Sequence, residues 1–170
     1  MQKNNPSHRR ILFLAQAAVI AALYAGLTLA TPLLSYGNIQ FRFAEAFTLL
    51  PVLTPAAIPG LTIGCAIANI ASPDLGVFDV VFGSLATLLA ALCSYWLRKI
   101  LLCKLPLLSA LMPALFNGVI IGLMLHLMLG FPLWLTMGQV ALSELIICCA
   151  LGLPLVALLK KTKIFQQELG

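Results

Sequence analysis

The chain has 170 residues, of which 62% are hydrophobic and 9% charged, and its mean hydropathy is +1.07. This composition excludes an ordinary soluble domain and indicates an integral membrane protein, because only a bilayer solvates so much apolar surface. The formal net charge of +5 does not indicate a nucleic-acid partner, since the basic residues form no stripe that could hold phosphates.

Five long apolar regions follow one another along the chain, at 11–35, 43–72, 75–97, 105–130 and 133–159. Four of them suit a single membrane span of about 20 residues. The region 43–72 differs, because Pro51, Pro55 and Pro59 interrupt it at four-residue spacing. Since proline breaks helices, this region is either one kinked helix or two short helices, about 42–54 and 58–72.

The basic residues decide between five and six spans. With Arg42 as the exception, they form three groups: Lys3/Arg9/Arg10, Arg98/Lys99/Lys104 and Lys160/Lys161/Lys163. Lys and Arg near span ends favour the cytoplasmic side, and only six spans put all three groups there. The sequence therefore predicts an all-α integral membrane protein, with a single six-helix domain over 1–170, short second and third helices, and both termini in the cytoplasm.

The polar residues within the predicted spans and their outer loops lie mostly in the outer half of the membrane. Taken in chain order they are Arg42, Glu45, Asn69, Asp74, Asp79, Asn117, His126, Gln139, Ser143 and Glu144. A channel would need polar groups along its whole path, whereas a pocket open to one side needs them at one end. The sequence therefore predicts an externally facing binding site.

Several of these residues have a second interpretation. Arg42 and Glu45, three residues apart, form either an interfacial ion pair or part of the site. Asp74 suits a loop or a helix cap, and His126 suits a water-facing interfacial position. Glu144 is the strongest candidate, because a carboxylate among apolar neighbours in a membrane is costly without a partner.

Other side chains also have two interpretations, one as part of the pocket and one as part of the structure. Asp79 lies past the first turn of the fourth span, which favours the pocket, while Asn117 either lines the pocket or bonds a neighbouring helix. Aromatic residues at the outer ends of spans form an interfacial belt or stack on a flat ligand; they are Tyr36, Phe41, Phe43, Phe78, Phe82 and Trp134.

Small residues follow one another in the first span. Ala18 and Ala22 repeat at i, i+4, with Ala17, Ala21, Ala25 and Gly26 alongside. Small residues let a second helix approach closely, so this face packs either within the chain or against a partner protein. The five cysteines lack metal-ligand spacing, no phosphate-binding loop indicates an ATP site, and no nucleophile–base pair indicates an enzyme.

Three segments and one pattern carry a resemblance to a known family. They are Ala18-x-x-x-Ala22-Leu-Tyr24, YGNIQFRFAEAFTLLP at 36–51, TPAAIPG at 54–60 and DVVFGSLAT at 79–87. The chain resembles the substrate-binding S components of energy-coupling factor transporters, and among them the QueT family, which is proposed to take up queuosine precursors.

The resemblance implies a partner set and a mechanism. The partners are a membrane coupling subunit, onto which the Ala18/Ala22 face docks, and two cytoplasmic ATPases. The S component would topple in the bacterial cytoplasmic membrane and so carry its pocket inward. No cofactor is expected. The alternatives are an S component for another small vitamin-like ligand, and a stand-alone proton-coupled carrier in which Glu144 titrates.

The implied ligand, a 7-deazaguanine, presents adjacent N–H donors, one carbonyl acceptor and a flat face. A carboxylate can accept both donors together, and the surplus of acids over Arg42 suits a cationic aminomethyl compound. We expect Glu144 to make one carboxylate contact and Asp79 or Glu45 the other. The candidate amide contacts are Asn69, Asn117 and Gln139, and Phe41 and Phe43 are candidates for stacking.

Overall fold

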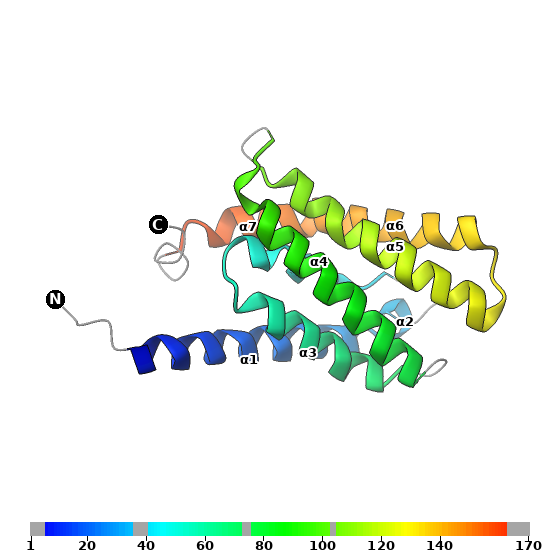
Figure 1. Cartoon of the computed structure of the whole chain (residues 1–170), viewed down its shortest axis with the longest axis horizontal. Helices are drawn as coiled ribbons and strands as arrows, with labels where there is room; N and C mark the ends of the chain where they lie inside the picture. Colours follow the sequence, from blue (N-terminus) through cyan, green and yellow to red (C-terminus); the bar gives the residue numbers. More distant parts are fainter. Residues whose placement is uncertain (1–5, 36–40, 73–75, 103–104, 163–170) are drawn as a thin grey trace.

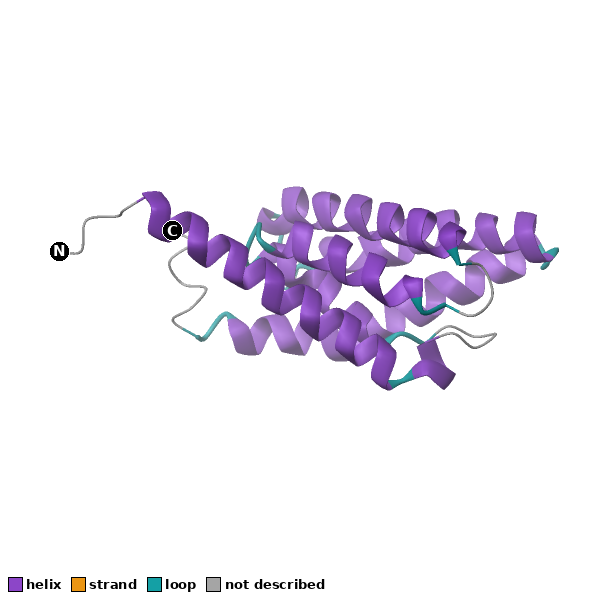
Figure 2. Ribbon diagram, turned by 90° about the horizontal axis from the view of Figure 1, so that it is seen from below, coloured by secondary structure: helices purple, strands orange, loops and turns teal. Residues whose placement is uncertain are grey.

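The computed structural model describes residues 6–35, 41–72, 76–102 and 105–162, and their regular structure is helical apart from one isolated bridge between Leu102 and Leu105. The helices lie roughly lengthwise in one elongated bundle (Figures 1 and 2). Four apolar helical stretches are long enough to cross a membrane: Ser7–Ala30, Asp79–Lys99, Leu107–Leu129 and Leu133–Leu159. The prediction of an all-α membrane protein is thus confirmed.

Two of the four long stretches combine several helical elements. The first stretch is a single helix, α1 (Pro6–Ala30), which is followed by the short α2 (Pro32–Ser35). A π-helical turn, η2 (Asp79–Gly83), continues into α4 (Ser84–Trp96) and η3 (Leu97–Lys99). After α5 (Leu107–Leu129), the last stretch joins α6 (Leu133–Ile147), a second π-helical segment η4 (Cys148–Gly152) and α7 (Leu153–Leu159).

The region 43–72 forms two short helices, as its prolines allowed. They are η1 (Phe43–Val52) and α3 (Ala57–Ile70), close to the predicted bounds. The structure differs from the prediction in the kind of helix, because η1 is a 3-10 helix. At about 2.0 Å per residue it extends about 20 Å, a length that an α-helix reaches only with about 13 residues.

The 3-10 geometry also decides which residues of η1 share a face. Side chains three residues apart eclipse in such a helix, so Glu45 and Thr48 follow Arg42, the N-cap residue, along one side. Eight of the ten residues of η1 are buried, which makes it the centre of the bundle. Its core neighbours include Tyr24 of α1 and Leu61 of α3.

Small residues bring neighbouring helices into backbone contact. A Cβ atom on Gly60 would lie 2.7 Å from the carbonyl oxygen of Ala17, and one on Gly64 would lie 2.8 Å from that of Ala21. The face of α1 that carries Ala17 and Ala21 therefore packs within the chain against α3. Larger residues at these positions would force the helices apart, as at other helix contacts in membranes.

The first described helix begins, and the last one ends, at the same end of the bundle. The start of α1, the end of α7 and the connection from α4 to α5 lie at one end, while the turn from α5 to α6 lies at the other (Figure 1). The described basic residues outside the centre, among them Arg10, Lys99 and Lys160, belong to the first end. The number of six spans and the side of the membrane on which this end lies stay predictions.

Candidate binding site

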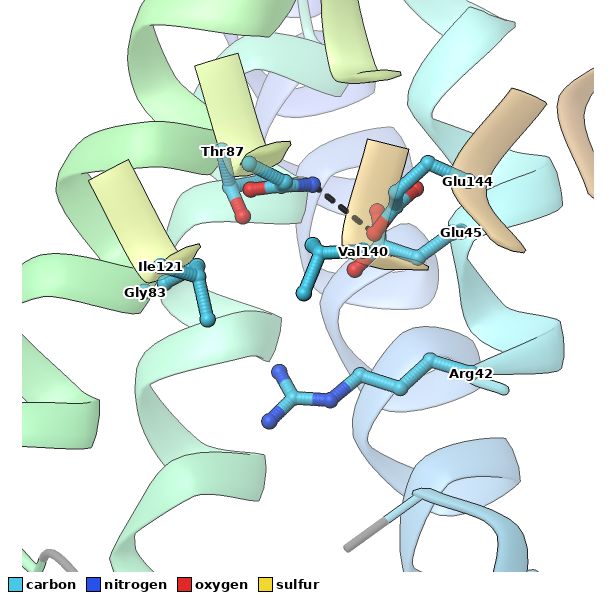
Figure 3. A pocket seen from close by; sticks show the side chains of 8 residues that line it. Arg42, Glu45, Gly83, Thr87, Ile121, Val140 and Glu144 are labelled. Carbon is cyan, nitrogen blue, oxygen red and sulfur yellow. Dashed lines mark hydrogen bonds between the residues drawn. The ribbon is translucent and has the colours of Figure 1, made fainter. Parts of the chain in front are cut away.

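A small cavity lies between the central 3-10 helix and three long helices (Figure 3). Its volume is about 10 Å³, which is room for about one water molecule. The residues that line it are Arg42, Glu45, Gly83, Thr87, Asn117, Ile121, Val140 and Glu144. Charged and amide side chains thus meet inside an otherwise apolar bundle.

The spacing of the lining residues follows from the helices that carry them. Gly83 and Thr87 lie four residues apart, and the pairs Asn117/Ile121 and Val140/Glu144 repeat this spacing on α5 and α6. Residues four apart in an α-helix lie on the same face. Arg42 and Glu45 are three apart, as a 3-10 helix requires. The continuous helix formed by η2 and α4, and each of η1, α5 and α6, therefore contributes one turn of one face to the cavity.

Two carboxyl groups lie close together in this cavity. Glu45 is 2% exposed and Glu144 is 7% exposed, and Figure 3 shows their carboxyl groups on the same side. The Oε1 atom of Glu45 accepts a hydrogen bond from the hydroxyl of Tyr24. The Oε1 atom of Glu144 accepts one from Nδ2 of Asn117 at 3.0 Å. Each carboxyl group is thus held through one of its oxygens.

The second oxygen of each carboxyl group is different. Within the described part of the chain, Oε2 of Glu45 and Oε2 of Glu144 are buried and accept no hydrogen bond. Buried polar atoms are nearly always paired, because an unmade hydrogen bond costs about 1–3 kcal/mol. Two such acceptors in one cavity suit a ligand that brings its own N–H donors.

Arg42 supplies the positive charge of the site. It precedes the first turn of η1, and its Nε donates to the carbonyl oxygen of Ser35 at 3.3 Å. Its guanidinium group reaches into the same space from below the two carboxyl groups in Figure 3. A guanidinium can donate to a carbonyl or carboxylate oxygen in a fixed geometry. The cavity therefore combines two acids with one base.

Four of the residues predicted for the site line the cavity: Arg42, Glu45, Asn117 and Glu144. The other lining residues were missed, because Gly83, Thr87, Ile121 and Val140 are common residues of membrane helices. One available signal was the i, i+4 spacing to a polar residue, which connects Ile121 to Asn117 and Val140 to Glu144.

Asp79 and Asn69 are outside the set of residues that line the cavity in this structure, and their predicted contact with the ligand stays a prediction. Nδ2 of Asn69 donates to the backbone carbonyl of Asp79 at 2.8 Å, and the hydroxyl of Ser72 donates to Oδ2 of Asp79. These bonds connect the end of α3 to η2. Asn69 also fills the space beside Gly83, where a Cβ atom would lie 2.3 Å from its Nδ2. Both residues therefore brace the wall behind the cavity.

Gln139, Phe41 and Phe43 also lie away from the cavity lining. Gln139 is exposed, because it precedes the inward-facing Val140 by one residue, or about 100° around the helix. Phe43 is 36% exposed and Phe41 is half-buried. In this structure none of the three is placed to contact a molecule in the cavity.

The remaining polar candidates have other positions. His126 lies at the turn from α5 to α6, where its Nδ1 is 2.6 Å from the carbonyl oxygen of Phe131. This contact suits the interfacial interpretation of His126. Asp74 and Tyr36 lie outside the described residues.

The first helix has a second face of small residues. Ala18, Ala22 and Gly26 are exposed at i, i+4 and i+8, and a Cβ atom on Gly26 would meet nothing within 4 Å. Ala17 and Ala21, one residue earlier in each turn, face α3. Packing within the chain and an open small-residue face thus coexist on α1.

Apolar helices around a buried polar cavity define a polytopic membrane protein, and this arrangement suits one that handles a small polar molecule. The sequence profile of the QueT transporter family matches residues 14–161, so the chain belongs to that family of transporters. The family predicted from the sequence segments is confirmed.

One curated relative is the "Queuosine precursor transporter QueT" of Lactococcus lactis subsp. cremoris (strain MG1363), which is 41% identical over 73 residues. The alignment covers 42% of this chain and 42% of that protein, so the matched part is less than half of the relative's length. No solved structure matches the chain.

Proposed function

We propose that the chain is the substrate-binding component of an energy-coupling factor importer, and that it binds a queuosine precursor of the 7-deazaguanine type. The name of the Lactococcus relative supports the ligand class. The observation that carries the proposal is the pair of buried carboxyl oxygens in one cavity, Oε2 of Glu45 and Oε2 of Glu144, which accept no hydrogen bond from the described residues.

The chemistry of a 7-deazaguanine complements this set of groups. Its adjacent N–H donors match a carboxylate, and we assign them to Glu144. Its carbonyl oxygen matches a guanidinium donor, and we assign it to Arg42. The aminomethyl precursor carries an additional cation, for which Glu45 is the second acid of the cavity. Each of these contacts would be a charge-assisted hydrogen bond in a site shielded from water.

The size of the cavity adds a condition to the proposal. Pockets that enclose small ligands have volumes of about 300–1,000 Å³, whereas this cavity has about 10 Å³. A bicyclic base therefore binds only after the surrounding helices separate. Because the hydrogen bond between Asn117 and Glu144 joins α5 and α6, a separation of these two helices would break it.

The exposed face of α1 supports the proposed partner. Ala18, Ala22 and Gly26 offer a flat strip on which a second helix can approach closely. We propose that the membrane coupling subunit docks there, that two cytoplasmic ATPases drive transport, and that the chain topples as one body. Its orientation would place both termini in the cytoplasm.

The decisive experiment identifies the ligand. The protein is purified from cells that make queuosine precursors, and the small molecule released on unfolding is analysed by mass spectrometry. A 7-deazapurine is the expected result, and titration calorimetry with the aminomethyl compound and its nitrile relative measures the affinity. A different released molecule, together with no binding of either 7-deazapurine, overturns the ligand assignment and leaves the family unaffected.

A proton-coupled carrier is the second candidate function, because Glu144 is a buried acid within a membrane helix. The two candidates differ in what drives uptake. In vesicles that contain this chain without ATPases, uptake driven by a pH gradient favours the carrier. Uptake that requires the coupling subunit and ATP favours the importer component.

A further inference from the structure

Tyr24 connects α1 to Glu45, one of the two acids of the cavity. It is fully buried, at 0% exposure, and its hydroxyl donates to Oε1 of Glu45. The residues that line the cavity come from the η1 region, η2, α4, α5 and α6. Tyr24 on α1 is not one of them, so it contacts Glu45 from outside the cavity. Glu144 differs in this respect, because its partner Asn117 is itself a lining residue.

The ring of Tyr24 has a fixed position. It belongs to the core cluster that includes Leu49 of η1 and Leu61 of α3. A Cβ atom on Gly64 would lie 3.0 Å from the Cβ of Tyr24, so the absence of a side chain at Gly64 lets the tyrosine approach α3. A donor with so little freedom fixes the acceptor as well.

We propose that Tyr24 is a positioning residue for ligand binding. By holding Oε1, it orients the Glu45 carboxyl so that Oε2 is left for a donor or cation of the ligand. This inference rests on the proposed function, since it assumes that the cavity is the ligand site. The sequence alone does not indicate this role, because a tyrosine in an apolar span is usually interpreted as a core residue.

A purely structural role is the competing explanation. A buried tyrosine hydroxyl needs an acceptor wherever it lies, and Glu45 could serve only that need. Removal of the hydroxyl would then lower stability without changing ligand selectivity. If Tyr24 orients Glu45, its removal changes the affinity, and this change depends on the presence of the Glu45 carboxylate.

The binding experiment uses the full-length protein in detergent and the variant Tyr24→Phe. The matched control is Tyr95→Phe, because Tyr95 lies on α4 outside the cavity lining, with its ring against the guanidinium of Arg98 at 3.7 Å. Titration calorimetry with the aminomethyl 7-deazaguanine should show about 10- to 150-fold weaker binding for Tyr24→Phe, the loss expected for one hydrogen bond to a charged group. Tyr95→Phe should bind like the unmodified protein.

The selectivity and a double-mutant cycle identify the cause. Tyr24→Phe should weaken the aminomethyl compound more than the uncharged nitrile. In the Glu45→Gln background, adding Tyr24→Phe should cause little further loss. Unchanged affinity in Tyr24→Phe, or losses that simply add in the double variant, would overturn the proposal.

A measurement without ligand separates this inference from the proposed function. The infrared difference between the unmodified protein and Glu45→Gln identifies the carboxyl band of Glu45, which should shift in Tyr24→Phe and stay in Tyr95→Phe. Should Tyr24→Phe fail to fold, fluorotyrosine in a Tyr36→Phe/Tyr95→Phe background perturbs the same hydroxyl. An unshifted band overturns the positioning role. If the band shifts but the unmodified protein binds no 7-deazapurine, the proposed ligand is wrong, and the result still supports the conclusion that Tyr24 orients Glu45.

Discussion

Glu144→Gln is the substitution that tests the candidate site most directly. It keeps the size of the side chain and replaces one carboxylate oxygen with an NH2 group. In the folded protein, the contact of 3.0 Å between Asn117 Nδ2 and Glu144 Oε1 can persist, since the remaining oxygen still accepts. The change therefore acts on the position of Oε2, which accepts no hydrogen bond from the described residues.

The expected magnitude follows from the kind of contact that is lost. A ligand with two adjacent N–H donors would meet one donor where it had met an acceptor. Loss of a charge-assisted pair of hydrogen bonds in a shielded site costs about 2–4 kcal/mol, or roughly a 30- to 1,000-fold weaker affinity. Stability should change little, and removal of a buried charge with one unpaired oxygen favours a small increase.

The assay is titration calorimetry of the purified variant with a 7-deazaguanine compound, accompanied by a thermal unfolding curve. Gln139→Ala is the matched control, because Gln139 lies on the same helix with its side chain exposed. The control should bind normally. If Glu144→Gln binds within about threefold of the unmodified protein, the assignment of the donor edge to Glu144 is wrong.

Three further predictions follow from the packing of the bundle. Asp79→Asn should weaken the contact with Ser72 and lower the free energy of unfolding by about 1–2 kcal/mol. The ligand affinity measured by calorimetry should change less than about threefold. A loss of affinity above tenfold would indicate that Asp79 contacts the ligand. Ala22→Trp should abolish uptake in vesicles that contain the coupling subunit and ATPases yet leave binding intact, whereas Ala21→Trp should prevent folding because Ala21 contacts α3. Uptake by Ala22→Trp would exclude this face of α1 as the docking surface. In a cysteine-free background, Lys99→Cys should react with a membrane-impermeant maleimide only after permeabilisation, and labelling in intact cells would refute the cytoplasmic position of that connection.

The elements of the fold could be predicted from the sequence because their signals are local. Proline spacing predicted the break between the two short helices, and the length of the apolar runs predicted the long ones. The 3-10 form of η1 could not be predicted, since runs beyond three or four residues are uncommon. In the structure η1 is buried on nearly all sides, and these tertiary neighbours are not visible in a local sequence pattern.

The lining of the cavity was predicted only in part for a related reason. A buried acid is visible in a sequence, which identified Glu45 and Glu144. Whether a polar residue faces a cavity or a partner depends on the rotation of its helix and on its neighbours. Asp79 and Asn69 had the expected polarity and depth, but the contact between them and the approach of Gly83 become visible only in three dimensions.

The closed state of the cavity has a consequence for the kinetics of binding. The cavity has room for about one water molecule. If it is the ligand site, as proposed above, it admits a ligand only while the helices are apart, and the association rate scales with the fraction of time that they are. Binding that requires a conformational change is slower than the usual 10⁵–10⁷ M⁻¹s⁻¹ or so for preformed sites. The same closure slows dissociation. On the proposed function we therefore expect a slowly exchanging complex, which retains its ligand longer than its affinity alone suggests.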